Sequence, residues 1–159
     1  RLQLELKRLS EGGRFVPQEN FHITLHFIGE SNDLAGAVAA MREAARGIRP
    51  FTLHLGKYGR FEKSGGATSF VEVKGELAEL GALYESLQSA LYDNGFSREH
   101  KGYAPHITLG RGVLHGEEAM AEMLALRPNA SMTVQGFTLF ESARREGRVV
   151  YTPLHTERF

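Results

Sequence analysis

The tetrapeptide His-Ile-Thr-Leu occurs twice in the chain, at residues 22–25 and 106–109. The sequence has only seven histidines and four isoleucines among its 159 residues, so a chance repetition is improbable. On a β-strand, alternate side chains point to the same face and lie about 6.6 Å apart. We therefore expect the histidine and threonine of each copy to share one face, with the isoleucine and leucine turned toward a core.

Two imidazoles and two hydroxyls that face one cleft would suit reactions of a phosphodiester. Histidine titrates at about pH 6.5, so one imidazole can accept a proton while the other donates one. Of His22 and His106, one would deprotonate an attacking water and the other would protonate the departing ribose oxygen. The hydroxyls of Thr24 and Thr108 would bind the non-bridging oxygens as negative charge builds on them. A single copy would instead favour a purely structural hydrogen bond within a half-buried sheet.

The sequence predicts no metal site and no cofactor. His22 and His26 are four residues apart, a spacing that can bind one ion on a helix, but on a strand these side chains lie about 13 Å apart. The chain has no cysteine, which excludes disulfides, thiolate metal sites and a cysteine nucleophile. The remaining histidines have no partner at a recognisable spacing and receive no role: His54, His100, His115 and His155.

Composition predicts one soluble domain, with 42% apolar and 24% charged residues. No apolar run reaches the roughly 18–20 residues of a membrane helix, and residues 1–9 form no signal core, so the expected location is the cytoplasm. Because the formal net charge is zero, a polyanion must be bound by local basic clusters. Three clusters are candidates, although most such charges are simply solvated: Arg98, Lys101 and Arg111; Lys57, Arg60 and Lys63; Arg144, Arg145 and Arg148.

Periodicity and turn residues predict alternating helices and strands, with a similar order in the two halves that indicates an internal duplication. The leucines of residues 1–9 fit both the strand period and the helix period, and the composition of this segment favours a helix. Pro153 predicts an edge strand. The expected helices are Asp33–Arg46, Glu76–Asn94 and Glu117–Leu126, and the expected strands are Phe21–Ile28, Phe51–Lys57, Thr68–Lys74, Pro105–Arg111, Met132–Ser142 and Val149–Thr156.

The chain resembles the two-histidine phosphoesterase superfamily, and within it the RNA 2′,3′-cyclic phosphodiesterase, or 2′-5′ RNA ligase, family of LigT type. The signature of that family is a pair of His-x-Thr-x motifs, and the resemblance covers essentially the whole chain. The matching residues are Arg14–Pro17, Asn20–Leu25, Phe27–Gly29, Pro105–Leu109 with Arg111, and Phe137–Ser142.

The resemblance implies an α/β (α+β) fold of two lobes related by a pseudo-twofold duplication. Two mainly antiparallel sheets would face a central cleft, with helices on the outside, in a single domain over residues 1–159. Such enzymes open a terminal 2′,3′-cyclic phosphate of RNA to a 2′-phosphate without a metal, and some members also catalyse reversible 2′-5′ ligation. The implied partners are RNA ends, tRNA-like or other, bound by a monomer.

The resemblance also implies roles for individual residues. His22 would be the proton donor and His106 the proton acceptor, assisted by the two threonines. Further contacts to substrate or phosphate would come from Arg111, His26, Phe15 and Tyr103.

The chain departs from the family pattern in two places. Members usually begin with a strand before the first helix, and that strand is expected to be missing from the given sequence. His26 stands where relatives commonly carry a basic residue, and a peripheral or structural role is slightly favoured for it. Arg111 poses a separate question: it follows His106 by five residues, which would place it on the opposite strand face unless the strand twists or ends near Gly110.

Other functions are compatible with the same residues. The two-histidine chemistry could act on a small cyclic nucleotide or on a 2′-5′ linked oligonucleotide. A different class would be a non-catalytic protein that binds RNA ends, against which the intact histidines and threonines of both motifs argue.

Overall fold

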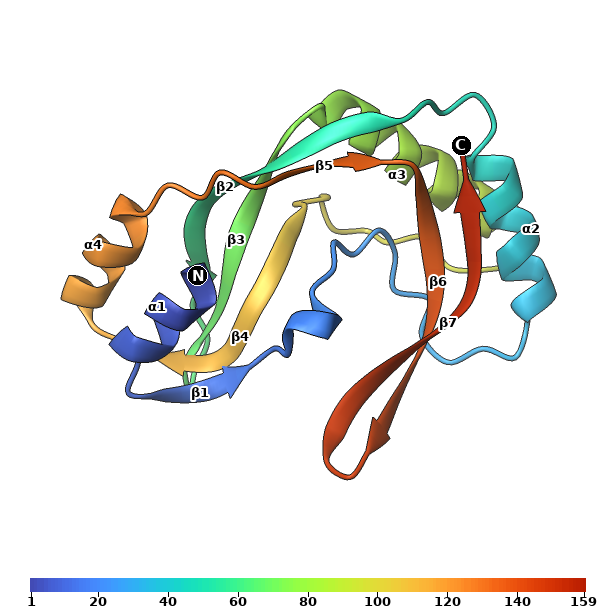
Figure 1. Ribbon diagram of the computed structural model, residues 1–159. Helices are drawn as coiled ribbons and strands as arrows, with labels where there is room; N and C mark the ends of the chain where they lie inside the picture. The colour runs from blue at the N-terminus through green and yellow to red at the C-terminus, as the bar shows by residue number, and fades with distance from the viewer. The chain divides into compact units, whose positions relative to one another are not determined.

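The chain folds into helices and antiparallel β-structure, and the computed structural model describes residues 1–159 (Figure 1). Five strands form one sheet in the order β1-β4-β3-β2-β5, and β6 and β7 form a second, two-stranded sheet. This architecture confirms the predicted α/β class with antiparallel sheets. The elements are α1 (Leu2–Leu9), β1 (Gly12–Phe15), the 3-10 helix η1 (Gln18–Asn20), α2 (Leu34–Ala44), β2 (Phe51–Phe61), β3 (Ala67–Gly75), α3 (Leu77–Asp93), β4 (His106–Leu114), α4 (Glu117–Ala125), β5 (Ser131–Val134), β6 (Gly136–Arg145) and β7 (Arg148–Arg158).

The chain divides into two compact units, each made of three segments. Unit 1 consists of residues 1–24, 54–74 and 105–131, and unit 2 consists of residues 25–53, 75–104 and 132–159. The His-Ile-Thr part of the first motif and the whole of the second motif belong to unit 1. The geometry of the two motifs can therefore be described within one unit.

Unit 1 has its core between the sheet and the helices α1 and α4, which contact each other. The leucine spacing of residues 2–9 produces a helix, as the composition favoured, and Leu6 on its inner face is fully buried. The core is formed by Leu6, Tyr58, Val71, Leu109, Val113 and Met123.

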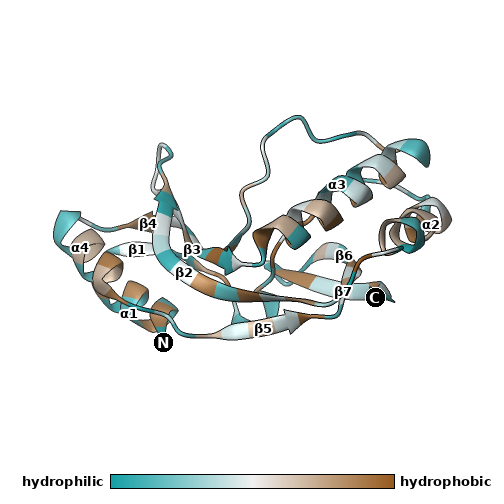
Figure 2. Ribbon diagram, turned by 90° about the horizontal axis from the view of Figure 1, so that it is seen from above, coloured by the Kyte–Doolittle hydropathy of each residue, from teal (hydrophilic) through white to brown (hydrophobic).

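Unit 2 is built on two amphipathic helices, α2 and α3, which pack against each other. Figure 2 shows hydrophobic and hydrophilic residues on both helices, as expected for helices that bury one face. The carboxylate of Asp33 accepts a hydrogen bond from the Gly36 amide and caps α2, and Gly47 follows that helix with a φ of 74°. Phe137 and Leu139 of β6 pack against the helical core, which consists of Ala40, Met41, Ala44, Leu87, Ala90 and Leu91.

Two sequence-based expectations about strands were wrong, and one strand was not predicted. Residues 21–28 do not form a strand, because only Ile23 pairs, through an isolated bridge to Ile107. Residues 132–142 are divided at Gln135 between β5 and β6. The short strand β1 had not been predicted, since its Gly-Gly-Arg-Phe sequence has low strand propensity.

No helix has the length and hydropathy needed to cross a bilayer.

Candidate active site

The second motif lies on β4, which is paired on both sides, with β3 and β1 as neighbours (Figure 1). On β3, Val71 pairs with Ile107 and is only 2% exposed. Directly paired residues of an antiparallel pair share a face, so Ile107 points to the core of unit 1. His106 and Thr108, the neighbours of Ile107, therefore occupy the opposite face, which we call the motif face. This arrangement confirms the predicted alternation.

The first motif is placed beside the second by the antiparallel bridge between Ile23 and Ile107. Ile23 shares the face of Ile107, so His22 and Thr24 belong to the motif face, and both are exposed. Antiparallel geometry sets His22 beside Thr108 and Thr24 beside His106. The two histidines are then diagonal neighbours, a relation in which Cα atoms lie about 7–8 Å apart. The histidines and threonines of both motifs therefore belong to one face.

The imidazoles are oriented by different groups. Nδ1 of His22 lies 2.7 Å from the carbonyl oxygen of Asn20. A carbonyl can only accept a hydrogen bond, so Nδ1 of His22 carries a proton and donates it to Asn20. The ring of His106 packs instead against two phenyl rings, with centroid distances of 5.5 Å to Phe61 and 5.3 Å to Phe70.

A β-bulge at Leu109 determines where Arg111 points. Thr108 pairs with Phe70 and Gly110 pairs with the next residue, Ser69, so Leu109 is an extra residue in β4. Ser69 is fully buried, and Gly110 therefore faces the core. The following residue, Arg111, returns to the motif face. Strict alternation would have placed it on the other face, and the bulge is the physical reason for the difference.

The bulge is held by a buried residue that the sequence analysis did not single out. The Nε2 group of Gln3, on α1, donates hydrogen bonds to the carbonyls of Val16 and Leu109 at 2.6 and 2.8 Å. Leu109 also accepts a hydrogen bond from the Val16 amide at 3.0 Å. The sequence did contain a sign of this role: Gln3 lies on the inner side of a leucine-rich helix, where only apolar residues are expected. Gln3 thereby connects α1 to the part of β4 between the motif and Arg111.

Phe15 is not brought to the motif face. It pairs with Gly110 and packs against the core of unit 1, so it lies on the opposite side of the sheet from His106. A β-carbon on Gly110 would stand 3.2 Å from the Phe15 ring and 2.8 Å from Val113. The glycine at this position is needed for β1 to approach β4 so closely.

His26 and Tyr103 belong to unit 2. The side chain of His26 is 5% exposed whereas Phe27 is 76% exposed, so the alternation that would have put His26 on the face of Thr24 is broken. Burial lowers the pKa of His26, and this is opposed by the Glu99 carboxylate, 3.9 Å from Nδ1, and by the Gln88 side chain. The Nδ1 atom has no hydrogen-bond partner. These features fit the structural role that the sequence slightly favoured.

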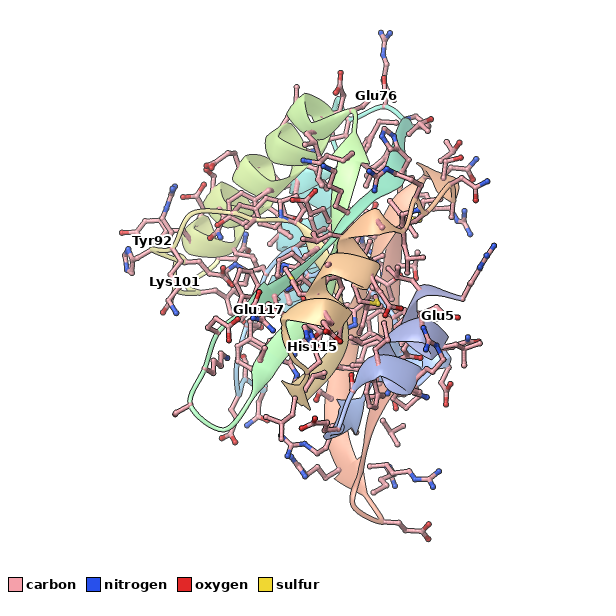
Figure 3. The ribbon with its side chains drawn as sticks, turned by 90° about the vertical axis from the view of Figure 1, so that its left-hand side faces the viewer. Glu5, Glu76, Tyr92, Lys101, His115 and Glu117 are labelled. Carbon is pink, nitrogen blue, oxygen red and sulfur yellow. The ribbon has the colours of Figure 1, made fainter.

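The ring of Tyr103 stacks on Tyr84 with a centroid distance of 4.2 Å, and burial raises the pKa of its hydroxyl. Both tyrosines line a cavity of about 160 Å³ in unit 2, to which Lys101, labelled in Figure 3, also contributes. The cavity contains both acidic and basic groups. Three of its lining residues were candidates from the sequence: Tyr103 as a substrate contact, and Arg98 and Lys101 as members of a basic cluster.

His115 has structural partners and stays outside the motif face. Its Nε2 lies 2.7 Å from the Tyr58 hydroxyl, which also contacts the Ser69 hydroxyl at 2.8 Å. Figure 3 labels His115 and Glu117 where β4 gives way to α4. Arg60, from one of the predicted basic clusters, forms ion pairs with Glu62 and Glu117. The structure brings together no group of three or more His, Cys, Asp or Glu side chains able to hold a metal.

Known proteins share both the sequence pattern and the fold. The model of the 2′-5′ RNA ligase superfamily matches residues 2–146. An RNA 2′,3′-cyclic phosphodiesterase of Escherichia coli is 32% identical, with 91% of this chain and 78% of the relative covered. One from Thermotoga maritima is 27% identical over 98% of this chain and 84% of the relative. The crystal structure of E. coli LigT complexed with 3′-AMP superposes with a TM-score of 0.76 at 26% identity, covering 99% and 90% of the two chains. The chain belongs to the 2′-5′ RNA ligase superfamily of two-histidine phosphoesterases.

Proposed function

We propose that the protein hydrolyses the terminal 2′,3′-cyclic phosphate of RNA to a 2′-phosphate, without a metal, using His22 as proton donor and His106 as proton acceptor. The observation that carries the proposal is the Ile23–Ile107 bridge, which aligns the motifs so that their histidines and threonines share one face. Several relatives named RNA 2′,3′-cyclic phosphodiesterase support the substrate class.

In the proposed reaction, His106 takes a proton from a water molecule as the water oxygen attacks phosphorus. The bond between phosphorus and the ribose 3′-oxygen breaks, and His22 gives its proton to that oxygen. The product carries a 2′-phosphate and a 3′-hydroxyl. The histidines finish with exchanged protonation states and return to the starting states by proton exchange with water. Ligation through a 2′-5′ bond would be the same ring-opening step with the 5′-hydroxyl of a second RNA in place of water. His106 takes the proton of that hydroxyl as its oxygen attacks phosphorus, the bond between phosphorus and the ribose 3′-oxygen breaks, and His22 gives its proton to the 3′-oxygen.

Thr24 and Thr108 would donate hydrogen bonds to the non-bridging oxygens. Each threonine stands beside the histidine of the other copy, so every proton-transfer group has a hydroxyl next to it. Hydroxyls placed in advance where charge develops lower the barrier because they need no reorganisation. With Nδ1 of His22 bound to the Asn20 carbonyl, Nε2 would be the nitrogen that gives the proton.

The test is incubation in EDTA with three substrates: an oligoribonucleotide ending in a cyclic phosphate, a bare 2′,3′-cyclic mononucleotide and a 2′-5′ dinucleotide. Chromatography against 2′- and 3′-phosphate standards identifies the product isomer. The proposal predicts a 2′-phosphate on the oligonucleotide. Exclusive turnover of the mononucleotide, or of the 2′-5′ dinucleotide, would move the assignment to that substrate. Binding without turnover of any of them would identify a non-catalytic RNA-end binder.

A further inference from the structure

Two arginines stand directly opposite each other next to the motifs. Arg14 of β1 pairs with Arg111 of β4, and both residues are exposed. Neither guanidinium has a hydrogen bond or an ion pair within the protein. Like charges directly opposite each other destabilise an antiparallel pair. The register therefore places two positive charges opposite each other, and no acidic side chain forms an ion pair with either of them.

Both arginines point to the motif face. The adjacent pair, Phe15 and Gly110, faces the core of unit 1, so Arg14 and Arg111 face the other way, together with His106 and Thr108. Arg111 is three residues beyond Thr108, a distance of at most about 10 Å along a strand. The guanidinium pair is thus close to the four motif side chains but separated from them by the bulge.

This position fits a second phosphate. The scissile phosphate is already surrounded by the two histidines and two threonines in the proposed function. An RNA end differs from a cyclic mononucleotide in having an internal phosphodiester next to the terminal ribose. Guanidinium groups bind phosphate oxygens with paired, charge-assisted hydrogen bonds, and an incoming phosphate would relieve the repulsion between the arginines.

We propose that Arg14 and Arg111 form a binding site for the internal phosphodiester that precedes the terminal cyclic phosphate. The site then recognises at least a dinucleotide, and Arg14 distinguishes RNA ends from cyclic mononucleotides. This inference rests on the proposed function and names its substrate more closely. Arg111 was expected to contact phosphate from the family resemblance, whereas the role of Arg14 and the identity of the phosphate follow from the strand register.

The experiment compares kcat/KM for three substrates: a 2′,3′-cyclic mononucleotide, a dinucleotide with a cyclic end, and the same dinucleotide with an uncharged methylphosphonate linkage. The wild-type protein should prefer the charged dinucleotide over both others. In Arg14→Gln, the loss should be about ten- to hundredfold greater for the charged dinucleotide than for the mononucleotide, the effect of a lost charge-assisted hydrogen bond. Arg42→Gln makes the same charge change at an exposed, unpaired position of α2 and should leave the preference intact.

Two further measurements distinguish this role from a structural one. The thermal midpoint of Arg14→Gln should equal or exceed that of the wild type, because a repulsive pair is removed. Calorimetric titration with a dinucleotide ending in a 2′-phosphate tests the site even without turnover, and Arg14→Gln should bind it at least about tenfold more weakly.

The outcomes separate the two proposals. If no cyclic phosphate is hydrolysed but Arg14→Gln still weakens binding of the dinucleotide, the proposed function fails and the phosphate site stands. If the wild type hydrolyses cyclic ends without preferring the charged dinucleotide, or Arg14→Gln affects all three substrates equally, the proposed function stands and this inference is wrong.

Discussion

The two copies of His-Ile-Thr-Leu have the same residues but different structural support. The second copy lies within β4, which is paired on both edges, and its histidine packs against Phe61 and Phe70. The first copy lies outside any strand and has one bridge, at Ile23, and a carbonyl contact from Asn20 to its histidine. The same four residue types are therefore positioned by a paired strand in one copy and by an irregular segment in the other. The comparison predicts that mutations equivalent in the sequence will differ in their effect on stability.

The largest effects should come from the histidines. Replacing His22 or His106 by alanine should reduce turnover about a hundredfold or more, the scale of a positioned proton-transfer group. The double mutant should be little worse, because groups that act as a unit are strongly non-additive. Thermal melts should separate the two copies: His106→Ala loses contacts with two phenyl rings and should be destabilised more than His22→Ala, which loses the contact with the Asn20 carbonyl at an exposed position. Near-normal turnover by folded His106→Ala would refute the mechanism.

Gln3 offers a way to disturb the second copy without touching the motif. Gln3→Met removes two hydrogen bonds: the partly buried carbonyl of Val16 loses its side-chain donor, and the buried carbonyl of Leu109 keeps only the Val16 amide. We expect a loss of about 1–3 kcal/mol in the free energy of unfolding, the usual cost of a buried unsatisfied group. Urea unfolding would measure it, with the exposed Gln18→Met as a control. A stability equal to that of the control would show that the bulge does not depend on Gln3.

The threonines should contribute less than the histidines. Thr24→Ala and Thr108→Ala should each reduce turnover by roughly tenfold, because a neutral hydroxyl supplies only part of the stabilisation and water can partly replace it. Single-turnover rates at saturating substrate are the appropriate measurement. A loss as large as that of the histidine variants would assign the threonines a part in proton transfer.

The sequence was sufficient to predict those elements that depend only on residue types and spacing within one segment. The amphipathic stripes of α2, α3 and α4 and the repeated tetrapeptide could be recognised from residue types and spacing. The strand face on which Arg111 lies could not be predicted, because it depends on the bulge at Leu109. That bulge is visible only in the pairing of β4 with β3. The pairing of Arg14 with Arg111 could not be predicted from the sequence either. The segment that forms β1 has little intrinsic strand propensity, and its approach to β4 depends on the glycine at position 110.

The structure of residues 21–28 could not be predicted from their sequence pattern either. Their alternation predicted a strand, yet only Ile23 has a ladder partner, and beyond Thr24 the burial pattern changes at His26. A period of two indicates which side chains share a face only while the backbone stays extended and paired. At His26 the alternation of side chains ends, because this residue is buried by tertiary contacts.

The smallest expected effect concerns His26, which follows the first copy, and it appears in stability rather than turnover. Burial lowers the pKa of His26 below its ordinary value of 6.5, against the opposing influence of Glu99 and Gln88. Between the two pKa values the unfolded chain binds more protons than the folded protein, so stability rises with pH in that window. The contribution is complete above about pH 6.5 and declines as the pH falls toward the folded pKa.

Urea unfolding at several pH values from 5 to 8 tests this sign. His26→Phe should remove part of the wild-type slope, whereas His54→Phe, at an exposed position, should retain it. If protonated His26 instead formed a strong ion pair with Glu99, the wild type would gain stability as the pH falls and His26→Phe would lose that gain. That result would mean that the carboxylate outweighs burial, and it would replace a neutral packing role for His26 with a charged contact in the segment that leaves the first motif.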